Sequence, residues 1–262
     1  MGVLNLTPDS FSDGGVFFAP DAALRRAERM LEEGVDIIDI GGESTRPGAA
    51  DVSAEDEIAR VVPVVRALAR RLPVPISVDT SKPEVMRAAA EAGATLINDV
   101  RALRAPGALG TAAALGLPVC LMHMQGEPRT MQAEPSYGDV VAEVRAFLAE
   151  RIAAAVAAGV PAESLLIDPG FGFGKRLPHN LGLLARLREL CDLDVPLLVG
   201  LSRKSMLGTL TGRDVSERLP ASLAAAVIAA ERGAKLLRVH DVAATVDAVK
   251  VVVAVAAAQA NA

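Results

Sequence analysis

The feature that most constrains the fold is a regular alternation of short apolar runs with longer Ala-rich segments along all 262 residues. The apolar runs are strand-sized, rich in β-branched residues and apolar on both faces except near their ends, as buried parallel strands require. Strands are predicted at 2–6, 35–40, 75–79, 94–98, 117–122, 164–168, 196–200 and 235–239. Helices are predicted near 20–34, 54–71, 83–92, 106–115, 139–158, 179–191, 216–232 and 241–258.

Eight strand–helix units without a break in composition predict an α/β protein, a single (β/α)8 TIM barrel forming one domain over residues 1–262. An open, doubly wound sheet is the alternative, disfavoured because the units continue to eight without a change in character. Local signals support the helix ends. Asp21 and Ser53 are predicted N-caps, Pro83 suits a first helical turn, and glycines expected just after helices are Gly34, Gly93, Gly116, Gly159 and Gly233.

The composition excludes several classes of protein. Hydrophobic residues make up 51% of the chain but aromatic residues only 3%, so the apolar content is aliphatic and sufficient for a packed core. The shortage of aromatic side chains and the net charge of −5 argue against a nucleic-acid partner. Two cysteines, Cys120 and Cys191, and three histidines support neither a disulfide scaffold nor a Cys/His zinc site.

The chain ends predict a cytoplasmic protein without a membrane partner. The start, MGVLNLTPDS, has no basic region and no long apolar stretch, so no signal peptide is expected. No apolar run reaches the roughly 18 residues that suggest a membrane span. The Ala/Val-rich segment 241–258 contains Asp247 and Lys250 at helical spacing and is predicted to be a docked amphipathic helix.

Reactive side chains collect where the predicted strands end, which in a barrel of this kind is the face that carries the active site. Acids and amides end five strands, and basic residues follow the last two. The acids and amides are Asn5, Asp39, Asp79, Asn98, Asp99 and Asp168, and the basic residues are Lys204, Arg238 and His240. Buried charges are costly unless they are paired or used, so this pattern predicts a functional site.

The residue types predict two zones within this site. Asp79, Asn98 and Asp168 suit a nitrogen-rich heterocycle that has several N–H donors. Lys204, Arg238 and His240 suit a phosphate or pyrophosphate. Asn5 is expected to meet the phosphate zone, because the first and last strands of a closed barrel are neighbours.

At these same residues the chain resembles the dihydropteroate synthases of the bacterial folate pathway. The resemblance covers nearly the whole chain, although members of the family usually have further residues before the first strand. The motifs, in order, are MGVLNLTPDSFSDGG (1–15), IDIGGESTRPGA (38–49), ISVDTSKPEV (76–85), LINDVRAL (96–103), VCLMHMQG (119–126), LLIDPGFGFGK (165–175), LLVGLSRKS (197–205) and LLRVHDV (236–242).

The resemblance implies an activity and a set of roles. The family condenses 6-hydroxymethyl-7,8-dihydropterin pyrophosphate with 4-aminobenzoate to give 7,8-dihydropteroate and pyrophosphate. By resemblance, the pterin is bound by Asp79, Asn98, Asp168 and Lys204. Asn5 would bind Mg²⁺ at the pyrophosphate, whose oxygens Arg238 and His240 would contact. Thr45, Arg46 and Pro47 would lie at the substrate junction, Phe173, Lys204 and Ser205 would receive aminobenzoate, and the first loop, with Phe11 and Asp13, would close over the site.

The same resemblance implies an SN1-like cleavage, a homodimer formed through late helices, and a sulfonamide target. Two other functions stay open at this point. One is a methyltransferase that moves a folate methyl group to a corrinoid, which would not need Asn5, Arg238 and His240. The other is a catalytically idle paralogue that serves as a binding subunit, in which site residues are typically lost.

Several polar residues also have a purely structural interpretation. His123 is either ligand-facing or, the favoured interpretation, a hydrogen-bonded histidine at a strand end. Asp39 and Glu43 either brace the second loop with Arg46 or contact substrate. Asp99 is expected to orient loops, and Cys120 to be a small core residue. The pair Lys175–Arg176 is predicted to be solvated rather than to form a rim that attracts pyrophosphate.

Overall fold

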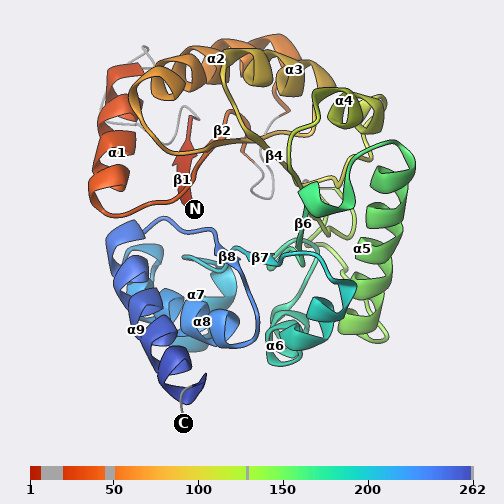
Figure 1. Cartoon of the computed structure of the whole chain (residues 1–262). Helices are drawn as coiled ribbons and strands as arrows, with labels where there is room; N and C mark the ends of the chain where they lie inside the picture. The colour runs from red at the N-terminus through yellow and green to blue at the C-terminus, as the bar shows by residue number, and fades with distance from the viewer. Residues whose placement is uncertain (7–19, 45–50, 128–129, 261–262) are drawn as a thin grey trace.

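Eight parallel strands alternate with helices in the computed structural model, which describes residues 1–6, 20–44, 51–127 and 130–260 (Figure 1). All eight predicted strands are present, and each is shorter than predicted. They are β1 (Gly2–Asn5), β2 (Ile38–Gly41), β3 (Ile76–Asp79), β4 (Leu96–Asp99), β5 (Val119–Met122), β6 (Leu165–Asp168), β7 (Leu198–Val199) and β8 (Leu236–Leu237).

The helices surround the strands in Figure 1. They are α1 (Pro20–Glu32), α2 (Ala54–Arg71), α3 (Pro83–Ala92), α4 (Ala108–Leu115), α5 (Val140–Ala157), α6 (Leu177–Ala185), α7 (Ser205–Thr211), α8 (Leu219–Glu231) and α9 (Val242–Ala260). Three short 3₁₀ turns, η2 (Ala162–Ser164), η3 (Leu187–Leu193) and η4 (Val215–Glu217), complete the order. The predicted helix 179–191 is therefore two elements, α6 and η3, and α7 was not among the predicted helical ranges.

The strands close into a barrel. Strands β1–β6 form one parallel sheet and β7–β8 another. At one junction, Val3 N donates to Val239 O (2.9 Å) and Val239 N donates to Met1 O (3.0 Å). At the other, Ile167 N donates to Pro196 O (3.0 Å), and Ile167 bridges Leu197 in parallel. Because both edges of the two sheets are joined, the predicted (β/α)8 fold class is confirmed.

The barrel interior has an apolar floor beneath a polar mouth. Met1, Leu96, Cys120, Leu166 and Leu198 form a buried cluster separate from the strand–helix core, so Cys120 is the core residue that was predicted. Side chains two positions apart on a strand point to the same face. Four floor residues are accordingly followed, two positions later, by residues nearer the mouth, namely Asn98, Met122, Asp168 and Gly200.

Most local helix signals behave as predicted. The Ser53 side chain accepts a hydrogen bond from Asp56 N at 3.0 Å and caps α2, and Pro83 occupies the first turn of α3. The prediction for Asp21 is wrong, because α1 already begins at Pro20 and Asp21 lies inside its first turn. All five glycines expected after helices have positive φ, at Gly34, Gly93, Gly116, Gly159 and Gly233.

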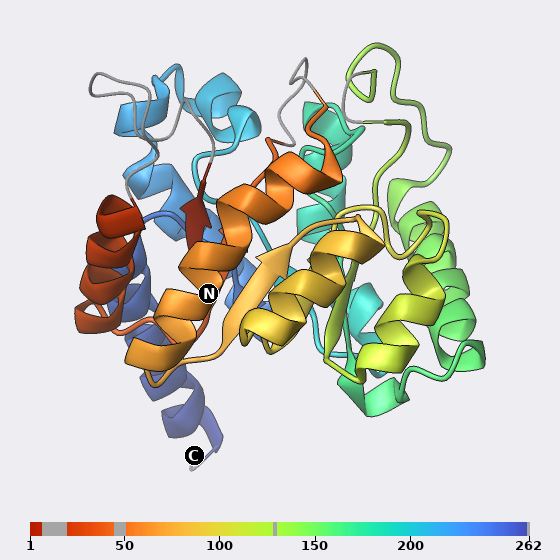
Figure 2. The ribbon, with the colours of Figure 1, turned by 90° about the horizontal axis from the view of Figure 1, so that it is seen from above.

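Helix α9 is docked over its first part, as predicted, but not over its second part. Val242 and Thr245 are buried, but Val251, Val253 and Val255 are 64%, 61% and 50% exposed. The end of α9 extends beyond the neighbouring helices (Figure 2). By length and composition Val242–Gln259 could cross a membrane, the one such helix in the described part of the chain.

Two of the helix-ending glycines form a matched pair for a stability test. Both have positive φ, but a Cβ at Gly93 would lie 2.6 Å from Ala69 Cβ, whereas a Cβ at Gly116 would meet nothing within 4 Å. Gly116→Ala is expected to lower the free energy of unfolding by about 1–2 kcal/mol through backbone strain. Gly93→Ala is expected to lose about 1–3 kcal/mol more through the steric overlap. Urea denaturation of both variants measures the difference, and equal losses would contradict it.

Candidate active site

Four residues on neighbouring strands form one row at the mouth of the barrel, and three of them carry polar side chains. Asn5 pairs in register with Gly41, Gly41 with Asp79, and Asp79 with Asn98. Register partners in a parallel sheet point to the same face, so this row lies inside the barrel. Gly41 leaves the row open between the Asn5 amide and the Asp79 carboxylate.

A pocket at this mouth gathers seven of the residues that the sequence predicted for the site: Asp79, Asn98, Asp168, Phe173, Lys204, Arg238 and His240. Five other residues complete its lining. These are Val100, Met122, Phe171, Gly200 and Ser202. Phe171 was predicted, with Phe173, to suit a ring-binding loop but was not among the predicted site residues, and the other four were not predicted. Their position at or just after strand ends was the signal that could have identified them.

The Arg238 guanidinium bridges two carboxylates instead of standing in a separate phosphate zone. Its Nε donates to Asp39 Oδ2 at 2.6 Å and its Nη2 donates to Asp79 Oδ2 at 2.8 Å. Asp39 is fully buried and its other oxygen has no hydrogen-bond partner within the described ranges. The two predicted zones therefore overlap at Arg238. Asp39 pairs with this arginine, a contact that neither of its two predicted roles included, and Arg46 lies outside the described residues.

Burial and charge together set the protonation of this network. Burial raises the pKa of Asp79 to about 7, against the opposing effect of Arg238. Burial also raises the pKa of Asp168, while the Gly170 N–H, which donates to Asp168 Oδ1 at 2.7 Å, acts in the opposite direction. Two carboxyl groups of the same pocket are thus held by different partners, one by a cation and one by a peptide N–H.

Lys204 faces the pocket from the end of the loop that precedes α7. Its Nζ lies 4.3 Å from the centre of the Phe173 ring, a cation–π contact. Burial lowers the pKa of Lys204 to about 8, with Asp168 acting to raise it. Lys204 is therefore a cation at neutral pH. It lies between the Phe173 ring and the carboxylates of Asp168 and Asp79.

His240 is neutral rather than the cation that the sequence suggested. Burial and the nearby Arg238 charge lower its pKa to about 4. His240 N donates to Ser202 Oγ at 3.2 Å, and Nδ1 lies 3.1 Å from the same oxygen. A hydroxyl that accepts from the peptide N–H can donate to Nδ1, and in that arrangement the ring proton lies on Nε2. His240 can then act as a neutral hydrogen-bond donor.

The loop next to the pocket is braced by an ion-pair cluster. Lys82 Nζ lies 2.6 Å from Glu43 Oε2 and 2.5 Å from Glu57 Oε2. Glu43 Oε1 also accepts from Val52 N at 3.0 Å. Glu43 is thus engaged in bracing, one of the two roles left open for it. Lys82 and Glu57 were not predicted, and an isolated Lys in a loop and a Glu inside a helix carry no clear signal of this pairing.

Asp99 and His123 hold loops, as expected for both. Asp99 is fully buried and accepts from Ser81 Oγ and from the backbone N–H groups of Arg101 and Leu103. His123 is 5% exposed, and its Nδ1 lies 2.8 Å from Lys175 Nζ. Neither side chain lines the pocket among the residues described there.

The prediction for Lys175 is wrong. Instead of forming a solvated pair with Arg176, Lys175 is 3% exposed. It donates to Gly170 O and Phe173 O within the β6–α6 loop, and its Nζ lies 2.8 Å from His123 Nδ1. Arg176 is exposed, as predicted. A charged residue that follows a glycine-rich segment has the same sequence appearance in both environments, so the pattern could not distinguish them.

Six predicted site residues lie outside this pocket or outside the described chain. Asn5 lies at the edge of the mouth, where a Cβ at Gly41 would be 3.8 Å from its Oδ1. Ser205 is exposed at the start of α7 and does not line the pocket. The remaining four, Phe11, Thr45, Arg46 and Pro47, lie outside the described residues, as does Asp13.

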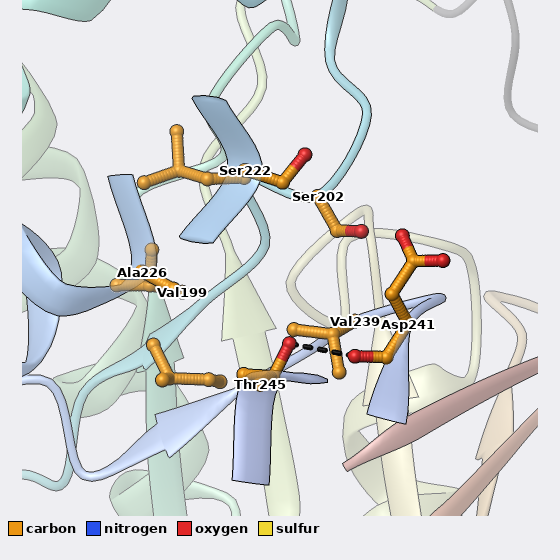
Figure 3. A pocket seen from close by; sticks show the side chains of 9 residues that line it. Val199, Ser202, Ser222, Ala226, Val239, Asp241 and Thr245 are labelled. Atoms are coloured by element: carbon orange, nitrogen blue, oxygen red, sulfur yellow. Dashed lines mark hydrogen bonds between the residues drawn. The ribbon is translucent and has the colours of Figure 1, made fainter. Parts of the chain in front are cut away.

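A smaller cavity lies behind β7 and β8 and shares only Ser202 with the lining of the pocket at the mouth (Figure 3). Ser202, Asp241 and Thr245 border it, and Thr245 Oγ1 donates to Asp241 O at 2.7 Å. Its volume is about 10 Å³, close to that of one water-sized probe. This cavity can hold at most a single water molecule, so it is not a substrate site. The pocket at the mouth is the candidate substrate site because it gathers seven of the predicted site residues.

Comparison with known proteins gives consistent matches. Residues 1–240 match the family described as pterin binding enzyme. A dihydropteroate synthase of Escherichia coli (strain K12) is 59% identical over 261 residues, which cover 100% of this chain and 93% of the relative. The structure of Yersinia pestis dihydropteroate synthase with a sulfonamide drug complex matches with a TM-score of 0.94 and 56% identity, covering 98% of this chain and 93% of that one. Xanthomonas albilineans dihydropteroate synthase with 4-aminobenzoic acid matches with a TM-score of 0.93 and 57% identity, covering 98% and 92%.

The low pKa of the buried His123 side chain can be tested through the pH dependence of stability. Burial and the Lys175 charge lower its pKa from 6.5 to about 2, so below pH 6.5 the unfolded chain binds a proton that the folded chain does not. This lowers stability as pH falls, by up to about 1.4 kcal/mol per pH unit. His123→Gln removes the effect, so its free energy of unfolding is expected to fall less steeply than that of the wild type between pH 6.5 and 4. Urea denaturation at several pH values that gave parallel profiles would contradict the assignment.

Proposed function

The chain belongs to the family of pterin-binding enzymes, and we propose that it acts there as a dihydropteroate synthase, a transferase of folate biosynthesis. Its substrates are then 6-hydroxymethyl-7,8-dihydropterin pyrophosphate and 4-aminobenzoate, and its products are 7,8-dihydropteroate and pyrophosphate. The observation that carries this proposal is the single pocket that joins Asp79, Asn98, Asp168, Lys204 and Arg238. It is supported by 59% identity to a dihydropteroate synthase over the full chain.

In this proposal the acids and the amide of the mouth bind the pterin. Asp79, Asn98 and Asp168 offer oxygen acceptors to the N–H groups of the heterocycle, and Lys204 donates to its acceptor atoms. Because Asp168 Oδ1 already accepts from Gly170 N, the other oxygen of this carboxylate is the one available to substrate. The free volume of the pocket is about 40 Å³, well below the roughly 300 Å³ or more of ligand pockets. Pterin binding therefore requires long side chains such as Arg238 and Lys204 to move.

The pyrophosphate is bound at the last two strands. Arg238 supplies positive charge, and His240 donates a hydrogen bond from Nε2. His240 immediately precedes Asp241 and the N-terminus of α9, where backbone N–H groups favour anions. This agrees with the frequent phosphate site of the fold after strands 7 and 8.

The mouth also fits a magnesium ion at Asn5. The test is the donor set: Asn5 Oδ1 and Asp79 Oδ2 are hard oxygen atoms, each within 4 Å of the position that a Cβ at Gly41 would take. The described residues hold no cluster of three or more His, Cys, Asp and Glu suited to a metal. Mg²⁺ commonly uses one or two protein oxygens together with substrate phosphates, so Asn5 would hold the ion with the pyrophosphate. When bound, Mg²⁺ would neutralise charge on the leaving group.

The charges of the site favour a dissociative reaction. Cleavage of the C–O bond places negative charge on pyrophosphate and positive charge on the pterin methylene. Arg238 and the neutral donor His240 stabilise the first, and the carboxylates of Asp79 and Asp168 stabilise the second. The arylamine nitrogen of aminobenzoate is already neutral at pH 7, so its attack requires no strong protein base.

The remaining site residues complete the aminobenzoate side of the proposal. Phe173 offers its ring, Lys204 its charge, and Ser205 a hydroxyl at the start of α7. Three further residues, Thr45, Arg46 and Pro47, would lie at the junction of the two substrates, and Phe11 would close over them. A sulfonamide competing with aminobenzoate would then bind at the same residues.

We further propose a cytoplasmic homodimer with one domain over residues 1–262 and no membrane or nucleic-acid partner. The family match ends at residue 240, and α9, which follows, packs on α8. The exposed valines of α9 suit contact with a second copy of the chain. Asp247 and Lys250 interrupt the apolar surface of this helix, which argues against a membrane span.

The reaction is tested by mixing purified protein with dihydropterin pyrophosphate, aminobenzoate and Mg²⁺ and measuring dihydropteroate. The wild type is expected to form product. Lys204→Met and Arg238→Met are expected to lower kcat/KM by at least about 100-fold, since each removes charge at the reacting groups. Lys235→Met, at an exposed lysine before β8, is the matched control and is expected to retain activity. Absence of product from folded wild-type protein would contradict the function, and full activity of both site variants would contradict the residue assignment.

The homodimer is tested by light scattering after size-exclusion chromatography. The wild type is expected to elute with about twice the chain mass of 27.1 kDa. Val251 and Val255 lie one helical turn apart and share a face of α9. The double variant Val251→Asp, Val255→Asp is expected to elute as a monomer, because charge at an apolar contact opposes association. A wild type that is monomeric at micromolar concentration would contradict the proposal.

A further inference from the structure

Lys175 has a hydrogen-bonding environment that matches its ammonium group fully. Its Nζ lies 2.8 Å from His123 Nδ1, 2.9 Å from Gly170 O and 3.1 Å from Phe173 O. An ammonium has three N–H donors and no acceptor, so these three partners use all of its protons. When Lys175 is protonated, His123 Nδ1 is therefore the acceptor, and the proton of the neutral His123 ring lies on Nε2.

Burial of the Lys175 ammonium carries a desolvation cost that lowers the stability of the fold. None of the three partners is a carboxylate, and the side chain is 3% exposed. When Lys175 is protonated, its charge is therefore buried without direct contact to a counter-ion among the described residues. Burial and Lys204 lower the pKa of Lys175 to about 7, and the field of Asp168 opposes that change. An apolar side chain of similar length would fill the same space without the desolvation cost. A buried charge of this kind beside a cleft is a candidate for a functional role.

The groups that Lys175 holds are those that shape the pocket. Both backbone polar groups of Gly170 are held: its N–H donates to Asp168 Oδ1 and its C=O accepts from Lys175. The Phe173 carbonyl is held by the same ammonium, while the Phe173 ring lies against Lys204 Nζ. One buried cation therefore connects the carboxylate proposed for the pterin to the ring proposed for aminobenzoate.

The loop that contains these groups is packed tightly against the segment after β5. His123 N donates to Asp168 O at 2.9 Å. Gly170 and Gly174 both have positive φ, and a Cβ on either would overlap a backbone oxygen, that of His123 or of Gln125. Backbone contacts to the segment after β5 and the hydrogen bonds of Lys175 together restrain the loop between β6 and α6.

We infer that Lys175, hydrogen-bonded to His123, is a positioning residue that aims the free oxygen of Asp168 and the ring of Phe173 at the two substrates. The inference rests on the proposed function, because it assigns Lys175 to that reaction. Lys175 does not line the pocket as described, so it acts through the Gly170 and Phe173 peptides.

The test compares Lys175→Met with the wild type and with Arg176→Met, a control at the exposed neighbour. Methionine keeps the length of the side chain but donates no hydrogen bond. Thermal unfolding first establishes a temperature at which all three proteins are folded, and kcat and both KM values are measured there. Lys175→Met is expected to raise the KM for each substrate and to lower kcat/KM by about 100-fold, as displaced reacting groups do. Arg176→Met is expected to match the wild type.

The outcomes separate this inference from the function on which it rests. A wild type that forms no dihydropteroate would contradict the proposed function itself. A folded Lys175→Met with wild-type kcat and KM values, whatever its melting temperature, would show a purely structural role and overturn the inference. If Lys175→Met does not fold, His123→Phe decides, because it removes one acceptor and leaves Lys175 in place. His123→Phe is expected to lower kcat/KM in the same direction by about tenfold, and unchanged constants in the folded variant would overturn the inference.

Discussion

The mouth of the barrel depends on one partly buried cation, the Arg238 guanidinium, which lies between carboxylates from two other strands. Asp39 and Asp79 both project into the barrel interior, where two unpaired negative charges would oppose each other and lack water. The contacts of 2.6 Å and 2.8 Å to Arg238 compensate both. Loss of the guanidinium would leave two uncompensated buried acids, a situation that destabilises proteins by about 3–5 kcal/mol. The same arginine is proposed to bind pyrophosphate, so binding the anion must rearrange a pairing that the unbound site already uses.

Two further cations, Lys175 and Lys204, lie around Asp168. Lys175 donates to two backbone carbonyls of its own loop, after β6. Lys204 faces the pocket and the Phe173 ring. The first holds the frame and the second is available to substrate. This division explains why both lysines can be buried near one carboxylate without making the same contact.

The fold and the location of the site could be predicted from the sequence because both follow from local rules. A parallel strand buried on both faces must be largely apolar, as in the Val119–Met122 and Leu165–Ile167 segments, and a polar residue at its end is then conspicuous. Asp79, Asn98 and Asp168 were identified in this way. The choice of partner is not local. Arg238 and Asp39 are 199 positions apart, and Lys175 and His123 are 52 apart, so no spacing along the chain indicates either contact. The neutral state of His240 likewise comes from burial and a neighbouring charge.

The central claim is that opposed charges in one pocket promote cleavage of the C–O bond before the arylamine attacks. The most direct measurement is pyrophosphate release from dihydropterin pyrophosphate and Mg²⁺ in the absence of aminobenzoate. The account predicts release that requires the protein and that is lost when Arg238 is replaced by Met. A strict requirement for aminobenzoate before any pyrophosphate appears would contradict it.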